Sequence, residues 1–322
     1  MSRALLLSAV LLTACGPAPE DASAVVTLSP EDLEQGEVTT AAPLRRGAED
    51  RSDTVDVMSW NVEWLGSPTE GPADELLQQA NVAKVLGQTA PDLIGLVEVV
   101  SEASFAAVLR GLPDHRGLLV TDPSVAQGRA FYWSGEQKVA LVYHRRFTVE
   151  SARVVLTDVQ GSFAGRPPME VKLRFEEGGR PRTLVVVVAH FKAMANLDGY
   201  TRRVEAAQAM KRWLDADYPT RWVLVIGDFN DDVDVSTYRR SPTPFAPFLS
   251  GGYRFTTDAL TKANISTTLT FSSTIDHHLA TDELAERFLE GSAKVVKTTD
   301  LIPDAKTTTS DHLPVLTRYD LR

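Results

Sequence analysis

The sequence predicts an α/β fold. Runs of aliphatic and β-branched residues with the length of buried strands recur along the chain, for example at 184–189 and 222–226. Longer segments between such runs carry apolar residues at helical spacing, most clearly at 202–216. With 322 residues, the chain is long enough for one large α/β domain or for two small ones.

The expected elements follow from these patterns in chain order. Helices are expected at 73–86, 102–109 and 202–216. The first helix should bury an apolar face made of Leu76, Leu77, Ala80, Val82, Ala83 and Leu86. The glycine pair in Glu177-Gly178-Gly179-Arg180 predicts a β-hairpin between two of the strands. Strands are expected at 55–62, 93–99, 138–144, 154–156, 170–175, 183–190, 222–226, 274–279, 293–296 and 313–319.

Chemically capable side chains stand at or next to the ends of six of these strands. Carboxylates and amides there offer hard oxygen ligands for a divalent metal, and histidines can move a proton. One polar turn of this kind would be unremarkable at the end of a strand, but six with only Asn, Asp, Glu and His indicate a site. The motifs are Trp60-Asn61, Val97-Glu98, Ala189-His190, Gly227-Asp228-Phe229-Asn230, Ile275-Asp276-His277 and Ser310-Asp311-His312.

This ordered set of motifs resembles the endonuclease/exonuclease/phosphatase superfamily. That superfamily includes pancreatic-type deoxyribonuclease, abasic-site endonucleases, inositol polyphosphate 5-phosphatases and neutral sphingomyelinases. The resemblance covers about residues 53 to 322. It implies a four-layer α/β sandwich, in which two mixed β-sheets pack face to face with helices outside. It also implies cleavage of a phosphate ester with a divalent metal, Mg²⁺ first, with Mn²⁺ or Ca²⁺ as alternatives.

The expected metal ligands are Glu98, Asn61 and Asp311. Glu98 is the strongest candidate from the residues themselves, because a hard cation prefers a carboxylate oxygen and Glu98 stands at a strand end. The resemblance places Asn61 beside it, in contact with metal or phosphate, and brings Asp311 to the metal region. Asp231, Asp232 and Asp234 are expected to form a solvated acidic loop, with a weaker second metal site as the alternative.

The expected catalytic residues are His190, Asp228, Asn230, Asp276 and His312. The resemblance assigns Asp228 to the attacking water and Asn230 to the scissile phosphate. Histidine titrates near neutral pH, so His190 and His312 are the candidate proton-transfer pair. The resemblance puts His190 near the leaving oxygen, as general acid, and His312 on the attacking side, oriented by Asp276.

Other polar residues are expected around these. Arg202 and Tyr143 are further candidate contacts to the substrate phosphate, and Lys192 and Arg203 are cations close to His190. The resemblance calls for an acidic partner of His190 near 135–138. Glu136 and Gln137 stand there, and the choice between them is open. His277 and His278 alternate along one strand, and His277 is expected to face the site.

The N-terminus reads as an export signal. Residues 1–14 hold one basic residue, a short apolar stretch and small residues before Cys15, which is the only cysteine. Leu12-Thr13-Ala14-Cys15-Gly16 resembles the bacterial lipoprotein box, in which the cysteine is acylated. Residues 15–52 are rich in Pro, Ala, Ser, Thr and acids, so they are expected to be a flexible linker before a catalytic domain at 53–322. The expected location is an outer-membrane or cell-surface lipoprotein, with its domain in the periplasm or outside.

Charge and context narrow the expected function. The chain carries 33 basic and 43 acidic residues, a net charge of −10, and loses Arg3 but no acid with residues 1–14. Such acidity argues against a tight, non-specific nucleic-acid binder but less against an enzyme that binds transiently. The leading expectation is a monomeric, exported, metal-dependent phosphodiesterase acting on DNA or RNA. The alternatives are a lipid-head-group phosphatase or sphingomyelinase-like enzyme, for which Phe131-Tyr132-Trp133 is the nearest candidate insertion segment, and a catalytically silent binding module.

Overall fold

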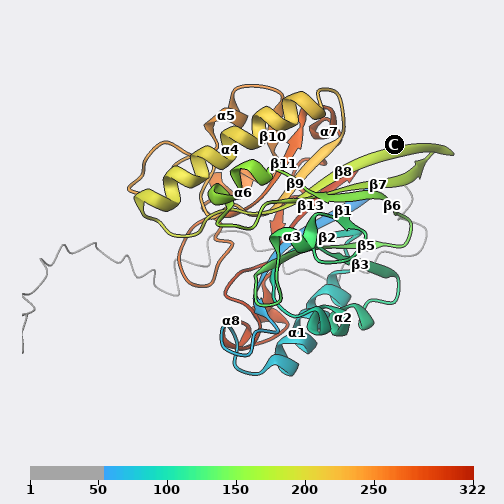
Figure 1. Cartoon of the computed structure of the whole chain (residues 1–322), viewed down its shortest axis with the longest axis vertical. Helices are drawn as coiled ribbons and strands as arrows, with labels where there is room; N and C mark the ends of the chain where they lie inside the picture. Colours follow the sequence, from blue (N-terminus) through green and yellow to red (C-terminus); the bar gives the residue numbers. More distant parts are fainter. Residues whose placement is uncertain (1–53) are drawn as a thin grey trace, which may run out of the picture. The chain divides into compact units, whose positions relative to one another are not determined.

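A computed structural model of the chain describes residues 54–322. These residues form two β-sheets packed face to face with helices on both outer faces, as Figure 1 shows. The expected four-layer α/β sandwich is therefore confirmed. The signal segment, Cys15 and the linker expected at 15–52 lie outside the described residues.

One sheet has six strands in the order β12-β13-β1-β2-β5-β3. β1 and β2 are parallel, whereas β13 runs antiparallel to β1 and β5 antiparallel to β2. Its strands are β1 (Thr54–Leu65), β2 (Leu93–Val99), β3 (His115–Leu119), β5 (Lys138–His144), β12 (Lys294–Val295) and β13 (Val315–Asp320).

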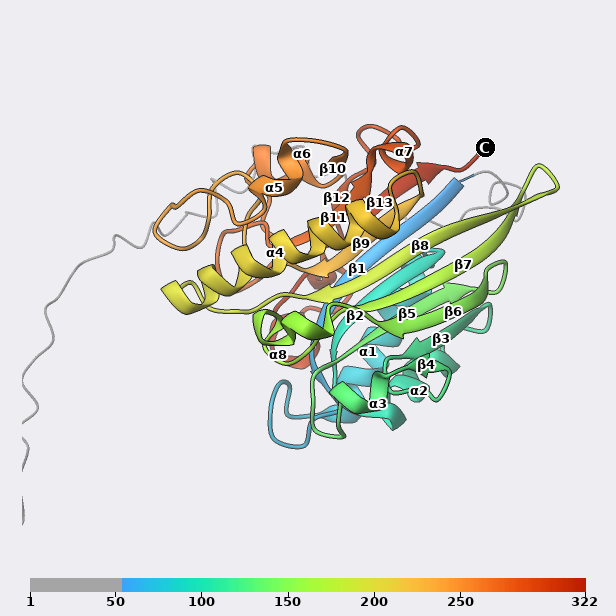
Figure 2. The same ribbon diagram turned by 45° about the horizontal axis from the view of Figure 1, so that its top comes forward.

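The other sheet has seven strands in the order β10-β11-β9-β8-β7-β6-β4. Its centre is the parallel pair β8 and β9, with β11 antiparallel to β9, and β7 and β8 form the long hairpin that extends to the right in Figure 2. Its strands are β4 (Val125–Ala126), β6 (Thr148–Val154), β7 (Met169–Glu177), β8 (Arg180–His190), β9 (Val223–Asp228), β10 (Tyr253–Phe255) and β11 (Asp276–Thr281).

The central core lies between the two sheets. Alternate side chains of β1, β2 and β5 meet those of β7, β8 and β9, because successive residues of a strand point to opposite faces. The sheets approach closely at Gly95 of β2, where a Cβ would lie 2.7 Å from Cδ1 of Ile226 in β9. Glycine at this point lets the two central strands come together, and this brings their carboxyl ends to one region.

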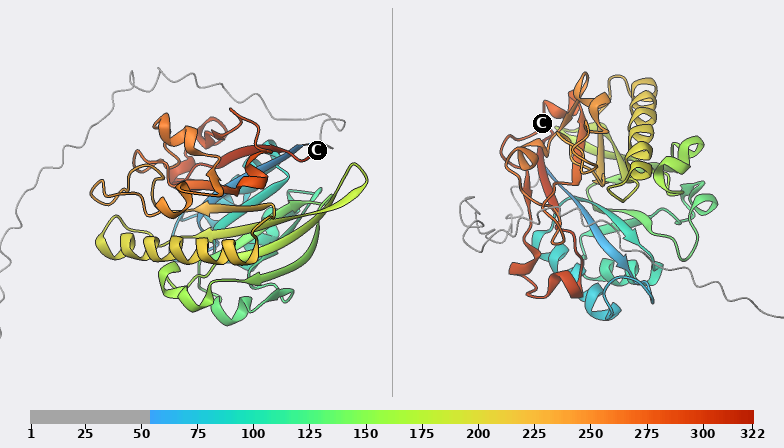
Figure 3. Two further views of the ribbon diagram at one scale, coloured as in Figure 1. Left: turned by 90° about the horizontal axis from the view of Figure 1, so that it is seen from above. Right: turned by 90° about the vertical axis from the view of Figure 1, so that its left-hand side faces the viewer.

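Two outer cores attach the helices. α1 (Glu75–Thr89) and α2 (Glu102–Arg110) cover the six-stranded sheet, and α4 (Leu197–Asp217) with α5 (Ala246–Leu249) covers the seven-stranded sheet (Figures 1 and 3). Among the described residues, no helix combines the length and hydropathy needed to cross a bilayer. The remaining short elements are α3 (Gly128–Phe131), η1 (Thr157–Phe163), α6 (Asp258–Lys262), α7 (Asp282–Ala285), η2 (Thr298–Asp300) and α8 (Ala305–Thr308).

The expected buried face of α1 is partly wrong. Leu76 and Leu77 are 78% and 41% exposed, whereas Val82 and Leu86 are buried as expected. The inward face instead includes Gln78, whose Nε2 donates to the carbonyl oxygens of residues 62, 63 and 309. Polar Gln78 is buried because it satisfies backbone groups of chain segments near the site, a tertiary role that hydrophobic spacing does not reveal.

Most expected strands are present, with small shifts of their ends. The strand expected at 154–156 is wrong: β6 ends at Val154, and Leu156 has a left-handed backbone before the 3₁₀ turn. Four strands were not expected, namely β3, β4, β6 and β10; β6 exposes Glu150, Ser151 and Arg153. β4 and β10 hold only two and three residues, and β3 begins with His115-Arg116-Gly117, so none shows a clear apolar pattern.

Candidate active site

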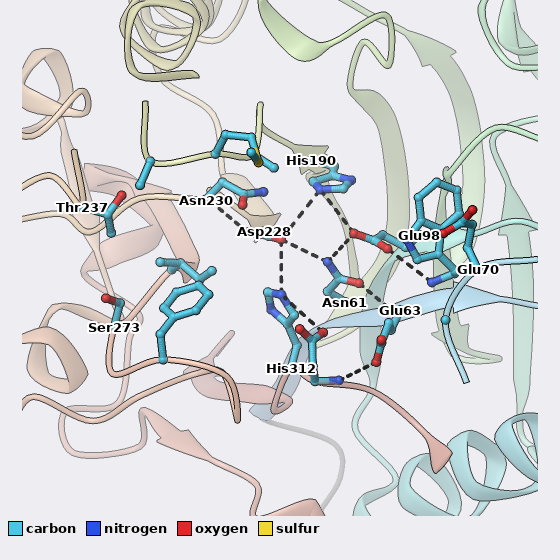
Figure 4. A pocket seen from close by; sticks show the side chains of 18 residues that line it. Asn61, Glu63, Glu70, Glu98, His190, Asp228, Asn230, Thr237, Ser273 and His312 are labelled. Atoms are coloured by element: carbon cyan, nitrogen blue, oxygen red, sulfur yellow. Dashed lines mark hydrogen bonds and ion pairs between the residues drawn. The ribbon is translucent and has the colours of Figure 1, made fainter. Parts of the chain in front are cut away.

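Strand direction brings the predicted motifs to one edge of the sandwich. The parallel pair β1 and β2 carries Asn61 and Glu98 towards its carboxyl end, and the parallel pair β8 and β9 ends in His190 and Asp228. β11 is antiparallel to β9, so its first residue, Asp276, pairs with Asp228. β13 is antiparallel to β1, so the residues just before it, including His312, lie at the same edge. A cavity of about 750 Å³ opens there (Figure 4).

Asn61 connects the two sheets at the floor of this cavity. Its Nδ2 donates to Oε1 of Glu98 at 2.9 Å and to Oδ2 of Asp228 at 3.0 Å, as Figure 4 shows. Its Oδ1 accepts the backbone N–H of Glu63 at 3.0 Å. Both amide hydrogens are therefore used to fix carboxylates, and the carbonyl oxygen keeps one lone pair for a ligand.

Glu98 stands at an interruption in β2. The pairing register of β2 shifts near this residue on both sides, and Glu98 has a left-handed φ of 65°, which is uncommon for a residue other than glycine. Its carboxylate also accepts the backbone N–H of Trp64 at 3.3 Å. Burial raises the pKa of the Glu98 carboxyl, and the hydrogen bond from Asn61 opposes this rise.

The Gly227-Asp228-Phe229-Asn230 motif works as a unit. Gly227 has φ 140°, and a Cβ there would lie 2.0 Å from the carbonyl oxygen of Ala189, so only glycine fits. Phe229 packs on Phe191, with ring centroids 4.8 Å apart. Asp228 Oδ1 accepts the backbone N–H of Asn230 at 2.8 Å. The motif thus holds Asp228 rigidly in the cavity.

Asp228 is a buried carboxylate between two histidines. Its Oδ2 lies 3.7 Å from Nε2 of His190 and 3.8 Å from Nε2 of His312. Burial and the nearby Asp276 carboxylate raise the pKa of Asp228 to about 7. A carboxyl group with this pKa can accept a proton near neutral pH.

The two histidines have opposite electrostatic environments. His312 Nδ1 lies 2.9 Å from Oδ2 of Asp276. Burial alone would lower its pKa, but Asp276, Asp228 and Asp311 raise the pKa of His312 to about 10. Burial lowers the pKa of His190 well below its usual value, and Arg166 adds to the effect. His312 is therefore the charged histidine and His190 the neutral one, opposite to what a general acid at His190 requires.

His190 also lacks the acidic partner expected near 135–138. Within residues 54–322, neither ring nitrogen of His190 has a hydrogen-bond partner, so the expectation of Glu136 or Gln137 is wrong. The nearest carboxylates are Glu98 and Asp228, each 3.7 Å from Nε2. Two buried ring nitrogens without partners, on the wall of a cavity, indicate that His190 meets a ligand there.

Comparison with known proteins bears on this arrangement. A model of the endonuclease/exonuclease/phosphatase family matches residues 58–312. The chain belongs to this family. Members of the family are generally metal-dependent phosphoric ester hydrolases, and the matched range includes Asn61, Glu98, His190, Asp228 and His312. No curated protein sequence matches the chain significantly.

Solved structures of this family share the fold at low sequence identity. An endonuclease/exonuclease/phosphatase from Bacteroides vulgatus is 17% identical, with a TM-score of 0.59 over 84% of this chain and 99% of that one. D. rerio TDP2, solved with a single-strand DNA product, is 16% identical, with a TM-score of 0.58 over 83% and 99%. The human Nocturnin catalytic domain, solved with a sulfate anion, is 16% identical, with a TM-score of 0.56 over 83% and 94%.

The residues also fit the divalent metal that enzymes of this family use. Ligand atoms of Asp228, Asp276 and His312 lie within 4.8 Å of one another, and this buried group could hold a cation. His312, however, already hydrogen-bonds Asp276 and is the charged histidine, whereas a metal ligand must be neutral. We therefore favour the carboxylate side of the cavity, where Glu98 and Asp311 offer hard oxygen ligands.

Glu63 is a cavity residue that sequence reasoning missed. Its Oε2 accepts the backbone N–H of Asp311 at 2.8 Å. Burial and the neighbouring Asp311 and Glu98 carboxylates raise the pKa of Glu63 to about 7. Strand alternation could not have placed it, because Glu63 and Trp64 have left-handed φ values of 45° and 53° where the register of β1 shifts. Burial is the main cause of this raised pKa and the negative charges of Asp311 and Glu98 add to it, so a cation bound nearby would favour the ionised form.

Arg166 is the second residue that was missed. It lies in the loop Gly165-Arg166-Pro167-Pro168 and is buried, with no hydrogen-bond partner for Nε among residues 54–322. Its positive charge lowers the pKa of both His190 and Glu98, so it stands near the cavity. No motif or periodicity in this loop indicated that role.

The structure places Tyr143 and Arg202 away from the site, which corrects two expectations. Tyr143 pairs with Leu93 at the start of β2, because β5 runs antiparallel to β2, and it therefore lies at the sheet edge opposite Glu98. Arg202 is on α4, where its Nε donates to Asp198 at 3.1 Å. Neither residue lines the cavity.

The position of His277 also differs from expectation. His277 hydrogen-bonds Thr257 and the carbonyl oxygen of residue 274 on the outer face of β11, while His278 points between the sheets to Ser59 and Thr317. Neither histidine lines the cavity. For His277, strand alternation is the reason, because Asp276 and His278 share one face of the strand and His277 takes the other.

The first acid of the loop after β9 is structural. Asp231 is buried and forms an ion pair with buried Arg203, with Nε and Oδ2 at 2.9 Å. Arg203 Nη1 also donates to the carbonyl oxygens of Lys192 and Met194. The pair therefore fixes the segment after His190 to the segment after Asp228, and the expectation of solvent exposure for Asp231 is corrected. Asp234 is exposed as expected.

Proposed function

We propose that this protein is a divalent-metal-dependent phosphodiesterase that hydrolyses nucleic acid, either DNA or RNA. The observation that carries the proposal is one cavity lined by Asn61, Glu98, His190, Asp228 and His312, with Asp276 behind His312. Hydrolysis of a phosphate ester requires a base, for which Asp228 is placed, and positive charge near the phosphate, which protonated His312 supplies. It also requires carboxylate ligands for a metal.

Asp228 is the residue we assign to the attacking water. Its pKa of about 7 suits a general base near neutral pH. The hydrogen bonds from Asn61 to Oδ2 and from the Asn230 backbone to Oδ1 fix both oxygens of the carboxylate, so its orientation does not depend on substrate. A water on Oδ2 would lose its proton to Asp228 as it attacks phosphorus.

His312, as imidazolium, is placed to donate from Nε2 to a phosphate or leaving oxygen, because Nδ1 is held by Asp276. Neutral His190 faces the same cavity and can donate one N–H to the phosphate. Arg166 adds positive charge behind it. Together these groups would stabilise the charge that develops on the phosphoryl oxygens.

We assign the metal to Glu98, with Asp311 and Asn61, and propose Mg²⁺. Glu63, Glu98 and Asp311 all line the cavity, so it gathers carboxylates that favour a bound cation. When bound, Mg²⁺ would supply Lewis-acid stabilisation of a phosphoryl oxygen.

The cavity wall supports a nucleic-acid substrate. Met194 and Phe271 line it, yet their side chains are 62% and 51% exposed. Exposed aromatic and apolar side chains beside a phosphate site are suited to contact a base. The volume of about 750 Å³ is within the usual range of about 300–1,000 Å³ for ligand pockets and exceeds what a phosphate group fills.

We also propose that the protein is exported and held at a membrane by an acylated Cys15. This rests on the sequence around Cys15 alone. It agrees with an extracytoplasmic nuclease, because nucleic acid is a phosphodiester met outside cells.

A substrate panel tests the proposed function. The purified domain is incubated with plasmid DNA, RNA, a phosphoinositide and sphingomyelin, each with Mg²⁺ and with EDTA. We expect cleavage of DNA or RNA that EDTA abolishes. Cleavage of only the lipids would move the protein to the lipid-head-group class, and no cleavage of any substrate would indicate a silent binding module. The variant Glu98→Gln controls for contaminating nucleases.

A further inference from the structure

We propose that a second hollow beside the active-site cavity binds a neighbouring phosphodiester of the polynucleotide, with Arg240 as its anion-binding residue. The inference rests on the proposed nuclease function and adds a substrate-length preference to it.

The second hollow has a volume of about 320 Å³ and lies between the loop after β9 and residues 261–274. Thr237 and Ser273 line both this hollow and the active-site cavity. The two hollows therefore adjoin across these residues. A substrate whose scissile phosphate lies beside Asp228 and which extends past Thr237 would enter the second hollow.

The wall of the second hollow is polar. Hydroxyl groups of Ser and Thr, an exposed amide at Asn264 and the guanidinium of Arg240 line it, with Val235 as an apolar exception. Such a wall suits a sugar–phosphate backbone better than an acyl chain or a base.

The two carboxylates in this wall are engaged by protein donors. Asp232 accepts from the Thr261 hydroxyl at 2.8 Å and from the backbone N–H groups of Val233 and residue 274. The exposed Asp234 accepts the backbone N–H of residue 235. These bonds satisfy the acids without removing their negative charge, and Arg240 is the one cation among the described residues that line this hollow.

Arg240 is free to bind an anion. It is exposed, and among the described residues it has no ion pair or hydrogen-bond partner for its side chain. A guanidinium binds a phosphate through two parallel N–H bonds, and this bidentate contact has stricter geometry than a lysine contact.

Arg239 provides a matched control. It is also exposed and has nearly the same backbone, with φ 52° against 53° for Arg240. Its guanidinium instead lies over the ring of Tyr238, 5.4 Å from the ring centroid. This is within the cation–π limit of about 6 Å. Arg239 lines neither hollow.

The experiment measures kcat/KM for a ten-nucleotide single strand and for bis(4-nitrophenyl) phosphate, which has no second phosphate. We expect Arg240→Ala to lower kcat/KM for the oligonucleotide about tenfold, the effect of one lost charge-assisted contact of about 1.4 kcal/mol. Activity on the small ester should change less than about twofold on the same reasoning. The salt dependence of log kcat/KM should weaken by about 0.7 for one lost phosphate contact. Arg239→Ala should leave both substrates unchanged, and Arg240→Lys should restore part of the loss.

Three outcomes would overturn the inference. If Arg240→Ala lowers kcat/KM equally on both substrates, Arg240 has a structural role. If it lowers kcat/KM on neither, the hollow binds nothing. In both cases, nuclease activity of the wild type leaves the proposed function standing. If the wild-type protein cleaves the small ester but no polynucleotide, the proposed function and this inference fail together.

Discussion

His312 and Asp276 form a hydrogen bond that joins the two sheets, with Nδ1 and Oδ2 2.9 Å apart. Asp276 begins β11 in the seven-stranded sheet, and His312 precedes β13 in the six-stranded sheet. The bond orients the imidazole so that Nε2 points to Asp228 and the cavity (Figure 4). The charge of His312 therefore depends on a residue that does not itself line the cavity.

Replacing Asp276 by Asn should lower the pKa of His312 from about 10 towards its ordinary value, because the neutral amide no longer stabilises the imidazolium. We expect kcat to fall about 10–100-fold, as for other residues that orient a reacting group. An NMR titration of the imidazole measures the pKa, and Asp258→Asn in α6, where Asp258 forms an ion pair with Lys262, is the control. An unchanged His312 pKa would refute the role of Asp276.

Glu98→Gln should weaken metal binding, because the substitution keeps the size of the side chain and removes the charge. Activity should fall by at least about 100-fold if several kcal/mol of charge stabilisation are lost. Titration of Mg²⁺ by calorimetry measures affinity directly. Glu70→Gln is the control, since Glu70 lines the same cavity but is exposed. Full activity of the wild type in EDTA would refute a metal mechanism.

His190→Ala and His312→Ala should each lower kcat by about 10²–10⁴-fold, the usual range for one positioned proton transfer. Because His312 is the charged histidine, a nitrophenyl ester, whose leaving group needs no proton, should rescue His312→Ala. It should not rescue His190→Ala. Rescue of the His190 variant alone would return the general acid to His190, as the sequence first indicated.

The metal-free protein should lose stability as pH rises through the range in which Glu63 titrates. The pKa of Glu63 is about 7 in the folded protein against 4.5 ordinarily, so the folded state binds more protons between these values. The free energy of unfolding therefore falls from about pH 4.5 to about pH 7. Thermal unfolding in EDTA measures this.

Glu63→Gln separates this effect from other titrations. The variant should show a smaller fall in Tm over the same pH range, because Gln does not ionise. Mg²⁺ should raise the wild-type Tm more at about pH 7.5 than at about pH 5, since it relieves repulsion among ionised carboxylates. An identical pH dependence in the variant and the wild type would contradict the raised pKa of Glu63.

Cys15→Ala should prevent lipid attachment and release the protein from the membrane fraction, or leave it unprocessed. Fractionation and mass spectrometry of the N-terminus measure both. A mature Cys15→Ala protein that still partitions with membranes would disprove the lipoprotein hypothesis.

Most of the fold and many of the side chains that line the cavity could be predicted from the sequence because both depend on local patterns. Apolar runs such as those of β2 and β9 predict buried strands, and Glu98 and Asp228 follow them directly. The hairpin of β7 and β8 follows from its glycine pair. These features need only the neighbouring residues, so the sequence by itself determined most of the strands and the polar side chains at their ends.

Tertiary structure decided which of these groups meet and what charge they carry. The antiparallel direction of β5 takes Tyr143 to the far edge, and strand alternation turns His277 away from the cavity. Loop packing brings Arg166 close to His190 without any sequence signal. His190 is neutral and His312 is charged because one is buried beside cations and the other is surrounded by carboxylates from distant parts of the chain. Sheet pairing and desolvation are properties of the folded chain, and no local pattern encodes them.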